Sequence, residues 1–429
     1  MNKFIIHLLT FTSLICNAIF GQDDLNNVKI GSRLQISSEF LKEKREIQVY
    51  LPPTYYFSNK NNYPVVYLLD GDYNFHYVTG LIELMSNVSG KMPECIVVGI
   101  SDKGTAKYRK NCTPNEIAGK GGNADNFMSF ITNELKPFIS SKYRTVNYNM
   151  IIGHSMGGLF VTNYFLKKQD DFNVFIAIDP ALWVGEYEII NRADSIYENK
   201  NSLSPLFYIS SSNAPEMGID KYISVLEKHF PNKKKWKHFN LQNENHNSVG
   251  LPTIKNSFED IFYNWGISKK QFMEFKSANE VIDHYKKLSN EYSLTASIHP
   301  SFLGNIIYYY FNHNKKEDLL ILESGIKEHF PGSLEEFYNQ IALNYFENEE
   351  YQKAIENYTK SIAYNSSSFS AYDGIAKVYL AQGEYDSAIL NNKKSIELAK
   401  TCNARQWILN QLKATFDDIS ISMKNQEKE

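Results

Sequence analysis

The chain has 429 residues, which is more than one domain usually holds, so we expect two or three domains. Hydrophobic residues make up 43% of it and aromatic residues 14%, enough apolar surface for a sizeable core, and this excludes global disorder. The formal net charge of -3 argues against a nucleic-acid partner or an anionic membrane surface, because both select for a strongly basic face.

Cysteine usage is sparse. The chain has 4 cysteines, and they are widely scattered, with no Cys-x-x-Cys pair and no Cys/His cluster. We therefore expect neither a disulfide scaffold nor a metal site.

The N-terminus carries an apolar run at 4–20, which follows Lys3 and precedes the polar residues 22–24. This pattern is typical of a secretory signal peptide, cleaved after Ala18 or Gly21. The run is shorter than the roughly 20 strongly apolar residues of a membrane-spanning helix, and it contains His7. We expect residues 1–21 to be a signal peptide, and the protein to be exported to the periplasm or the extracellular space, with no membrane span after its removal.

Short β-rich runs alternate with amphipathic segments over 22–266, which predicts an α/β domain with a mostly parallel sheet. The predicted strands are 47–51, 64–69, 95–100, 149–152, 174–178, 206–210 and 236–241. The clearest predicted helices are 126–140, 156–168 and 219–230. Several of the strand runs are continuously apolar, as in strands buried on both faces.

After Trp265 the β-rich runs stop, which predicts a domain boundary near 266, a helical connector over 267–303 and a helical domain over 304–429. The helical domain contains an internal repeat. Tyr338, Ile341, Ala342, Tyr345, Ala354 and Tyr358 recur 34 residues later as Tyr372, Ile375, Ala376, Tyr379, Ala388 and Asn392. This period and residue order resemble the tetratricopeptide repeat, although an unrelated helical bundle is an alternative.

Residues 153–158, Gly-His-Ser-Met-Gly-Gly, follow a predicted strand and open a predicted helix. A Gly-x-Ser-x-Gly sequence in this context is typical of a nucleophile elbow, in which a strained turn exposes the serine hydroxyl at the carboxyl edge of the sheet. We therefore interpret Ser155 as a catalytic nucleophile.

A serine nucleophile needs a general base, and the base is expected on a loop after the last strand. His246 lies there, whereas His229 falls on a predicted helix and His238 inside a predicted strand. We interpret His246 as the base.

The acid that orients the base is expected after the strand at 206–210, where Glu216 and Asp220 both occur. We favour Glu216, which lies close to the strand end, because Asp220 falls early in the next helix, where acidic residues commonly offset the helix dipole. Glu244 is a third candidate, but it is close in sequence to His246.

An oxyanion hole needs two backbone N–H groups, one from the residue after the nucleophile and one from the loop after the strand at 64–69. Met156 and Asp72 are the candidates, and we expect Asp70 to brace the turn that carries Asp72.

Several segments together resemble the putative esterase family of α/β-hydrolases over about 45–265. They are 67–72, the run 130–139, Tyr143-Arg144, the elbow, 179–183 and His246 with Ser248-Val249. The family includes siderophore trilactone esterases, feruloyl and acetylxylan esterases, S-formylglutathione hydrolases and mycolyltransferases. The resemblance implies the α/β-hydrolase fold, an oxyanion role for the Asp72 N–H, and substrate-binding roles for Trp183 and Arg109. In this sequence Val184 replaces the second aromatic residue of the family's Trp motif, and Lys110 and Asn111 replace a charged pair.

The function predicted from these features is hydrolysis of a carboxylic ester through an acyl-enzyme, without a cofactor. The substrate class is a siderophore ester or a carbohydrate-linked ester. The alternatives are an acyltransferase of the same fold, or a protein-binding module in which the hydrolase domain is vestigial. We expect the repeats to bind a protein partner or to cover the active-site entrance.

Overall fold

The computed structural model describes residues 28–102, 104–117, 121–275 and 277–426. The predicted signal peptide at 1–21 lies outside the described residues. Within those residues, no helix combines the length and the apolar character needed to cross a membrane.

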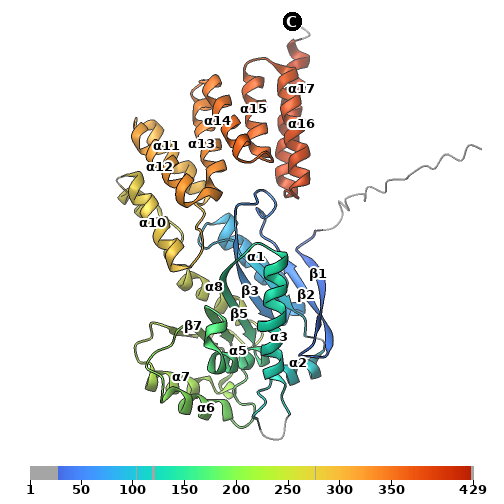
Figure 1. Cartoon of the computed structure of the whole chain (residues 1–429), viewed down its shortest axis with the longest axis vertical. Coiled ribbons are helices and arrows are strands. Elements are labelled where there is room, and N and C mark those ends of the chain that lie inside the picture. The colour runs from blue at the N-terminus through green and yellow to red at the C-terminus, as the bar shows by residue number, and fades with distance from the viewer. Residues whose placement is uncertain (1–27, 103, 118–120, 276, 427–429) are drawn as a thin grey trace, which may run out of the picture. The chain divides into compact units, whose positions relative to one another are not determined.

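The first half of the described chain forms one eight-stranded sheet (Figure 1) with the order β1-β2-β4-β3-β5-β6-β7-β8. The strands are β1 (Ser32–Ser38), β2 (Glu43–Tyr50), β3 (Tyr63–Leu69), β4 (Ile96–Ile100), β5 (Thr145–His154), β6 (Val174–Ile178), β7 (Leu206–Ser211) and β8 (Trp236–Asn240). The β1-β2 and β2-β4 pairs are antiparallel and all others are parallel, which confirms the predicted fold class. β1 is not among the predicted strands, because this edge strand is largely exposed and carries no continuous apolar run.

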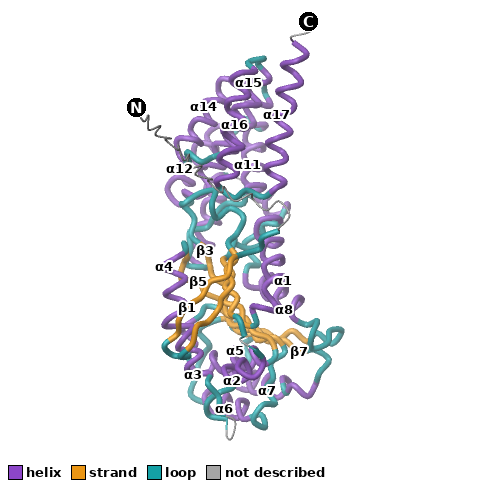
Figure 2. The backbone as a smooth tube through the Cα atoms, turned by 90° about the vertical axis from the view of Figure 1, so that its right-hand side faces the viewer, coloured by secondary structure: helices purple, strands orange, loops and turns teal. Residues whose placement is uncertain are grey.

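Helices cover both faces of the sheet. They are α1 (Gly71–Glu83), α2 (Thr105–Cys112), α3 (Ala124–Phe130), α4 (Lys136–Lys142), α5 (Met156–Lys167), α6 (Glu188–Tyr197), α7 (Ile219–His229) and α8 (Gly250–Ile261). Figure 2 shows α1 and α8 on one side of the strands, and α3 and α4 on the other. Every residue of β3, β4 and β6 is buried, as expected for strands covered on both faces.

The parallel part of the sheet places six loops at one edge. Parallel strands end on the same side, so the residues after β3, β4, β5, β6, β7 and β8 all emerge at the carboxyl edge. In open α/β sheets ligands bind at this edge.

Among the described residues after α8, the regular elements are helices (Figure 1). They are α9 (Lys269–Glu274), α10 (Ala278–Glu291), α11 (Pro300–Asn312), α12 (Lys316–His329), α13 (Leu334–Glu347), α14 (Tyr351–Tyr364), α15 (Phe369–Ala381), α16 (Tyr385–Thr401) and α17 (Gln406–Gln426). The predicted domain boundary at 266 falls between α8 and α9.

The helices α13 to α16 form two successive pairs, α13 with α14 and α15 with α16. Their second members begin at Tyr351 and Tyr385, which are equivalent positions of the two predicted repeat copies. Between the pairs, Gly374 lies against the ring of Tyr358, and a Cβ at 374 would be 2.2 Å from the ring Cζ. A larger residue there would push the pairs apart.

The helical segment contacts the sheet at the edge where β3 and β4 begin. His299 hydrogen-bonds to the carbonyl of Asn87, Asn365 donates to the carbonyl of Phe57, and the Tyr292 hydroxyl donates to the carbonyl of Ile261. None of these contacts lies on the loops that follow β5, β6 or β8. The structure therefore gives no support to the expectation that the repeats cover the active-site entrance.

Candidate active site

Ser155 lies in a sharp turn between β5 and α5. Its φ of 56° and ψ of −112° are a strained combination for a residue with a side chain. The glycines around it allow the close approach that the turn requires, since a Cβ on Gly153 would lie 2.4 Å from the carbonyl oxygen of Gly157. The turn holds the Ser155 hydroxyl at the carboxyl edge of the sheet, as predicted for a nucleophile elbow.

His246 lies in the loop between β8 and α8. Its Nε2 is 3.0 Å from Ser155 Oγ, within hydrogen-bond distance. The structure thus brings together the predicted nucleophile and the predicted base from positions 91 residues apart.

His154 braces this loop from the strand that carries Ser155. Its Nε2 donates to the carbonyl oxygen of His246 at 2.7 Å, and the two imidazole rings have centroids 4.6 Å apart. Burial, together with the charge of the neighbouring His246, lowers the pKa of His154 to about 4. His154 is therefore neutral near pH 7 and adds no positive charge beside the base.

Asp179 occupies the position of the acid. Its Oδ2 is 2.7 Å from His246 Nδ1, and the residue is fully buried directly after β6. The backbone N–H and the hydroxyl of Ser212 donate to the same carboxylate, at 3.0 Å and 2.7 Å. Burial alone would raise the pKa of Asp179, but the hydrogen bonds from His246 and Ser212 outweigh it and hold this pKa below its usual value. The carboxylate is therefore charged near pH 7 and can hold the Nδ1 proton of His246.

The prediction that Glu216 is the acid is wrong in this geometry, because the carboxylate that contacts His246 is that of Asp179. Glu216 is exposed on a short 3-10 turn at Pro215–Met217, and Asp220 is exposed in the first turn of α7. Glu244 accepts a hydrogen bond from the Ser248 hydroxyl. Among the described residues, none of these three carboxylates is hydrogen-bonded to His246. The reason lies in the strand order, since β6 is the immediate neighbour of β5 and β7 is one strand further away.

Two helix N-termini flank Ser155. Met156 is the first residue of α5 and Asp72 is the second residue of α1, so neither N–H has a partner within its own helix. The two helices follow β5 and β3, which are neighbours in the sheet. The Asp72 side chain is held by Gln48 at 3.1 Å. This arrangement is compatible with the predicted oxyanion hole, because helix N-termini favour negative charge.

Trp183 and Arg109 lie on the surface. Trp183 follows β6 in the loop that begins with Asp179, and it is 41% exposed. Arg109 is exposed on α2. In the part of the chain that the structure describes, no hydrogen bond or ion pair joins either side chain to the triad, so their substrate-binding roles stay predictions.

Asp70 braces the loop before α1. The residue has a left-handed backbone, with φ at 53°, and its carboxylate accepts a hydrogen bond from the Tyr108 hydroxyl. Burial raises the pKa of Asp70 to about 7, and Asp102 and Asp72 raise it further, against the lowering effect of the Tyr108 hydrogen bond.

Asp70→Asn should therefore stabilise the protein, and more so at high pH. The folded-state pKa is raised from 3.8 to about 7, so the stability of the wild type is full below pH 3.8 and falls as the pH rises through 7. Asparagine cannot ionise, tolerates a left-handed backbone and can still accept from Tyr108. We expect a Tm gain of at least about 2 °C at pH 8 and a smaller gain at pH 5. Scanning calorimetry of both proteins at the two pH values measures this difference. A gain independent of pH would contradict the assignment of a raised pKa.

Among the described residues, no group of three or more His, Cys, Asp or Glu side chains is arranged to hold a metal ion.

The doubly wound sheet, the elbow at Ser155 and the contacts of His246 define the class of the protein, which is an α/β-hydrolase. Residues 38–213 match the family described as "Putative esterase".

Three proteins illustrate the similarity. The ferri-bacillibactin esterase BesA of Bacillus subtilis is 30% identical over 155 residues, which cover 31% of this chain and 52% of that protein. The chain thus spans about half the length of this curated relative. An IroE-like serine hydrolase from Shewanella oneidensis is 25% identical with a TM-score of 0.58, over 70% of this chain and 99% of that structure. A protein of Capnocytophaga ochracea is 16% identical with a TM-score of 0.52, over 90% of this chain and 99% of that structure, and it shares the fold.

Proposed function

We propose that this protein is an exported serine esterase that cleaves a carboxylic ester through an acyl-enzyme. One observation carries the proposal. His246 lies between Ser155 Oγ, at 3.0 Å from its Nε2, and Asp179 Oδ2, at 2.7 Å from its Nδ1. A nucleophile, a base and a buried acid in this order are the working parts of serine acyl transfer.

The proposed reaction begins with proton transfer. His246 Nε2 takes the proton of the Ser155 hydroxyl as the oxygen attacks the ester carbonyl. Asp179 stays ionised, holds the Nδ1 proton and stabilises the imidazolium that forms. The N–H groups of Met156 and Asp72 receive the negative charge of the tetrahedral intermediate.

The second half of the reaction reverses these roles. The imidazolium of His246 gives its proton to the leaving alcohol, and Ser155 keeps the acyl group. His246 then deprotonates a water molecule, which attacks the acyl-enzyme and releases the acid. These reaction steps need no cofactor, because each transferred proton is held by a residue of the triad.

A siderophore ester is the proposed substrate class. The matching relative from Bacillus subtilis is named for ferri-bacillibactin, and the similar structure from Shewanella oneidensis is described as IroE-like. Trp183, on the loop that begins at Asp179, offers an exposed aromatic surface to such a ligand. A carbohydrate-linked ester is the second substrate class from the sequence, but no contact in the structure favours it.

Two further elements of the proposal rest on the sequence. Export rests on the apolar run at 4–20, and the classification of the helices as tetratricopeptide-like repeats rests on the 34-residue period. A protein partner for these helices is part of the proposal.

The test is an assay of the purified full chain with ferri-bacillibactin, a feruloyl ester and p-nitrophenyl acyl esters, with products read by mass spectrometry. Hydrolysis adds one water for each ester cleaved, and we expect ferri-bacillibactin to be the best substrate by kcat/KM. Turnover of the p-nitrophenyl esters alone would reject the siderophore class but keep the esterase. No turnover of any ester would reject the proposed function.

A further inference from the structure

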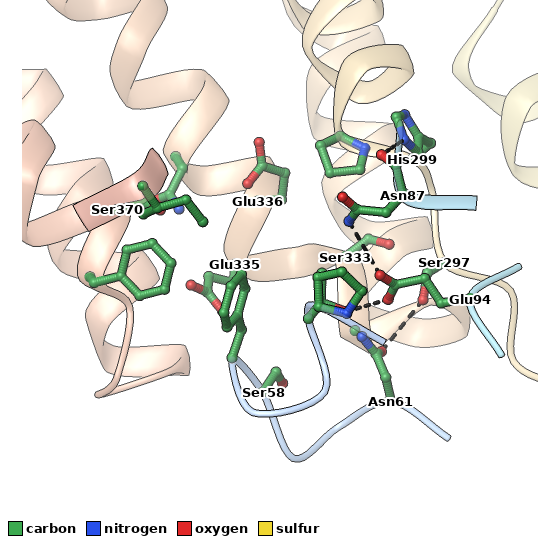
Figure 3. Close-up of a pocket in the computed structure, with 18 of the residues that line it drawn as sticks. Ser58, Asn61, Asn87, Glu94, Ser297, His299, Ser333, Glu335, Glu336 and Ser370 are labelled. Atoms are coloured by element: carbon green, nitrogen blue, oxygen red, sulfur yellow. Dashed lines mark hydrogen bonds between the residues drawn. The ribbon is translucent and has the colours of Figure 1, made fainter. Parts of the chain in front are cut away.

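A cavity of about 1270 Å³ lies where the helical segment meets the loops before β3 and β4. Residues of α13, α15 and α17 form one wall, and residues from 53–64 and 83–94 form the other. Figure 3 shows Glu335 and Glu336 on the helical side, and Glu94, Asn61 and Asn87 on the side of the sheet. The triad lies at the opposite edge of the sheet, so this cavity is separate from the active site.

Carboxylates dominate the charges that line the cavity. The lining contains Glu83, Glu94, Glu335, Glu336, Asp373 and Asp418 against the cations Lys377 and Arg405. Both cations are already paired, Arg405 with Glu83 at 2.5 Å and Lys377 with Asp373 at 2.7 Å.

Three glutamates of the lining face no cation of the described chain within ion-pair distance. Glu94 accepts from Asn87 and Thr54, Glu335 accepts from Asn365 at 2.6 Å, and Glu336 accepts from Gln340 at 2.7 Å. Burial raises the pKa of all three carboxyl groups, and the charge of Glu336 raises that of Glu335 further. A positive charge entering the cavity would offset this cost of holding carboxylates in a partly buried site.

Asn339 supplies an independent sign of a missing donor. It lies on α13 one turn after Glu335, lines the cavity, and is only 8% exposed. Its side-chain Oδ1 is buried and has no hydrogen-bond partner. A buried acceptor without a donor is costly, so this oxygen marks a place where a ligand N–H would fit.

The lining also contains apolar and aromatic side chains. Trp407 is 60% exposed and Leu343 is 37% exposed, although both side chains line the cavity. Phe57 and Phe369 meet edge to face with ring centroids 5.0 Å apart, one from each side. Such surfaces suit the aliphatic stem of a lysine or arginine, whose charged end would then reach the carboxylates.

We propose that this cavity binds a peptide segment of a partner protein that carries lysine or arginine side chains. The volume exceeds the roughly 300 to 1,000 Å³ of ordinary small-molecule pockets, and the wall runs across three helices, which suits an extended segment. The orphan acceptor and the three glutamates supply oxygen acceptors for ammonium or guanidinium donors. The proposal names the partner's chemistry and does not depend on the esterase activity.

The test uses the full chain and two fluorescein-labelled ten-residue peptides, one of alternating lysine and leucine and one with glutamate in place of lysine. Fluorescence anisotropy at 150 mM salt should give a Kd at least tenfold lower for the lysine peptide. The double variant Glu335→Gln/Glu336→Gln should weaken this binding at least fivefold. The control Glu356→Gln/Glu397→Gln removes two exposed carboxylates from α14 and α16, outside the cavity, and should leave the Kd unchanged. Hydrolysis of a p-nitrophenyl ester should be unchanged in all variants.

Three results would overturn the proposal. They are equal affinity for the two peptides, equal weakening by the cavity and control variants, and competition by spermidine at the affinity of the lysine peptide, which would indicate a small amine ligand. The thermal unfolding of each variant distinguishes loss of binding from loss of folding. If the cavity pair unfolds, Trp407→Ala replaces it as the cavity variant, and unchanged affinity in that variant overturns the proposal as well.

Discussion

Replacement of Ser155 by alanine should lower kcat for ester hydrolysis by roughly 10⁵- to 10⁶-fold, the scale of a lost nucleophile in a triad. The side chain accounts for chemistry and contributes little packing, since its one described side-chain contact is with His246 Nε2 at 3.0 Å. The Tm should therefore stay close to that of the wild type. Hydrolysis of p-nitrophenyl butyrate measures the rate.

Covalent labelling with a fluorophosphonate provides a second measurement, because the reagent reacts with an activated serine. Labelling should vanish in Ser155→Ala. Labelling that persists in the variant would show that another residue is the nucleophile, and the assignment of Ser155 would be wrong.

Asp179→Asn should lower kcat by roughly 10⁴-fold, with a small change in KM. The asparagine amide can donate to His246 Nδ1, which would place the imidazole proton on Nε2, where Ser155 needs an acceptor. The measured quantity is kcat for p-nitrophenyl butyrate between pH 6 and 9.

Glu216→Gln and Asp220→Asn are the matched controls, since each removes one exposed carboxylate that was a candidate for the same role. We expect each to change kcat by less than about twofold, as is usual for a surface substitution away from the site. A larger loss in either of them than in Asp179→Asn would return the acid role to the loop after β7.

The contact between Ser155 and His246 could be predicted from sequence because the position of each residue is fixed by local context. Ser155 stands in a strand-turn-helix sequence with its glycines, and His246 follows the last strand. The acid depends instead on which strand ends lie side by side, and this is a property of the sheet. The expectation that the acid follows β7 led to Glu216. Asp179 belongs to the segment 179–183 that carries the family resemblance, and its place directly after β6 is the signal that was available.

The fold class was predictable for the same reason that the individual strands were. Continuous apolar runs such as β3 and β4 indicate strands buried on both faces, whereas the largely exposed edge strand β1 has no such run. The side of the sheet on which the helical segment rests could not be predicted. It depends on contacts between residues more than 200 positions apart, such as Ser297 with Asn61, which no local pattern encodes.

The contact of His154 with the His246 carbonyl has a consequence for how the free energy of substrate binding would be used. The strand β5, which carries Ser155, also holds the loop that carries His246 through this hydrogen bond, so the two side chains share one rigid frame. Ser155 and His246 would then be aligned before the substrate binds. Binding would not have to order a flexible segment, which costs roughly 1 to 2 kcal/mol of conformational entropy for each backbone residue fixed. The free energy of ester binding can then be used to orient the scissile bond against Ser155.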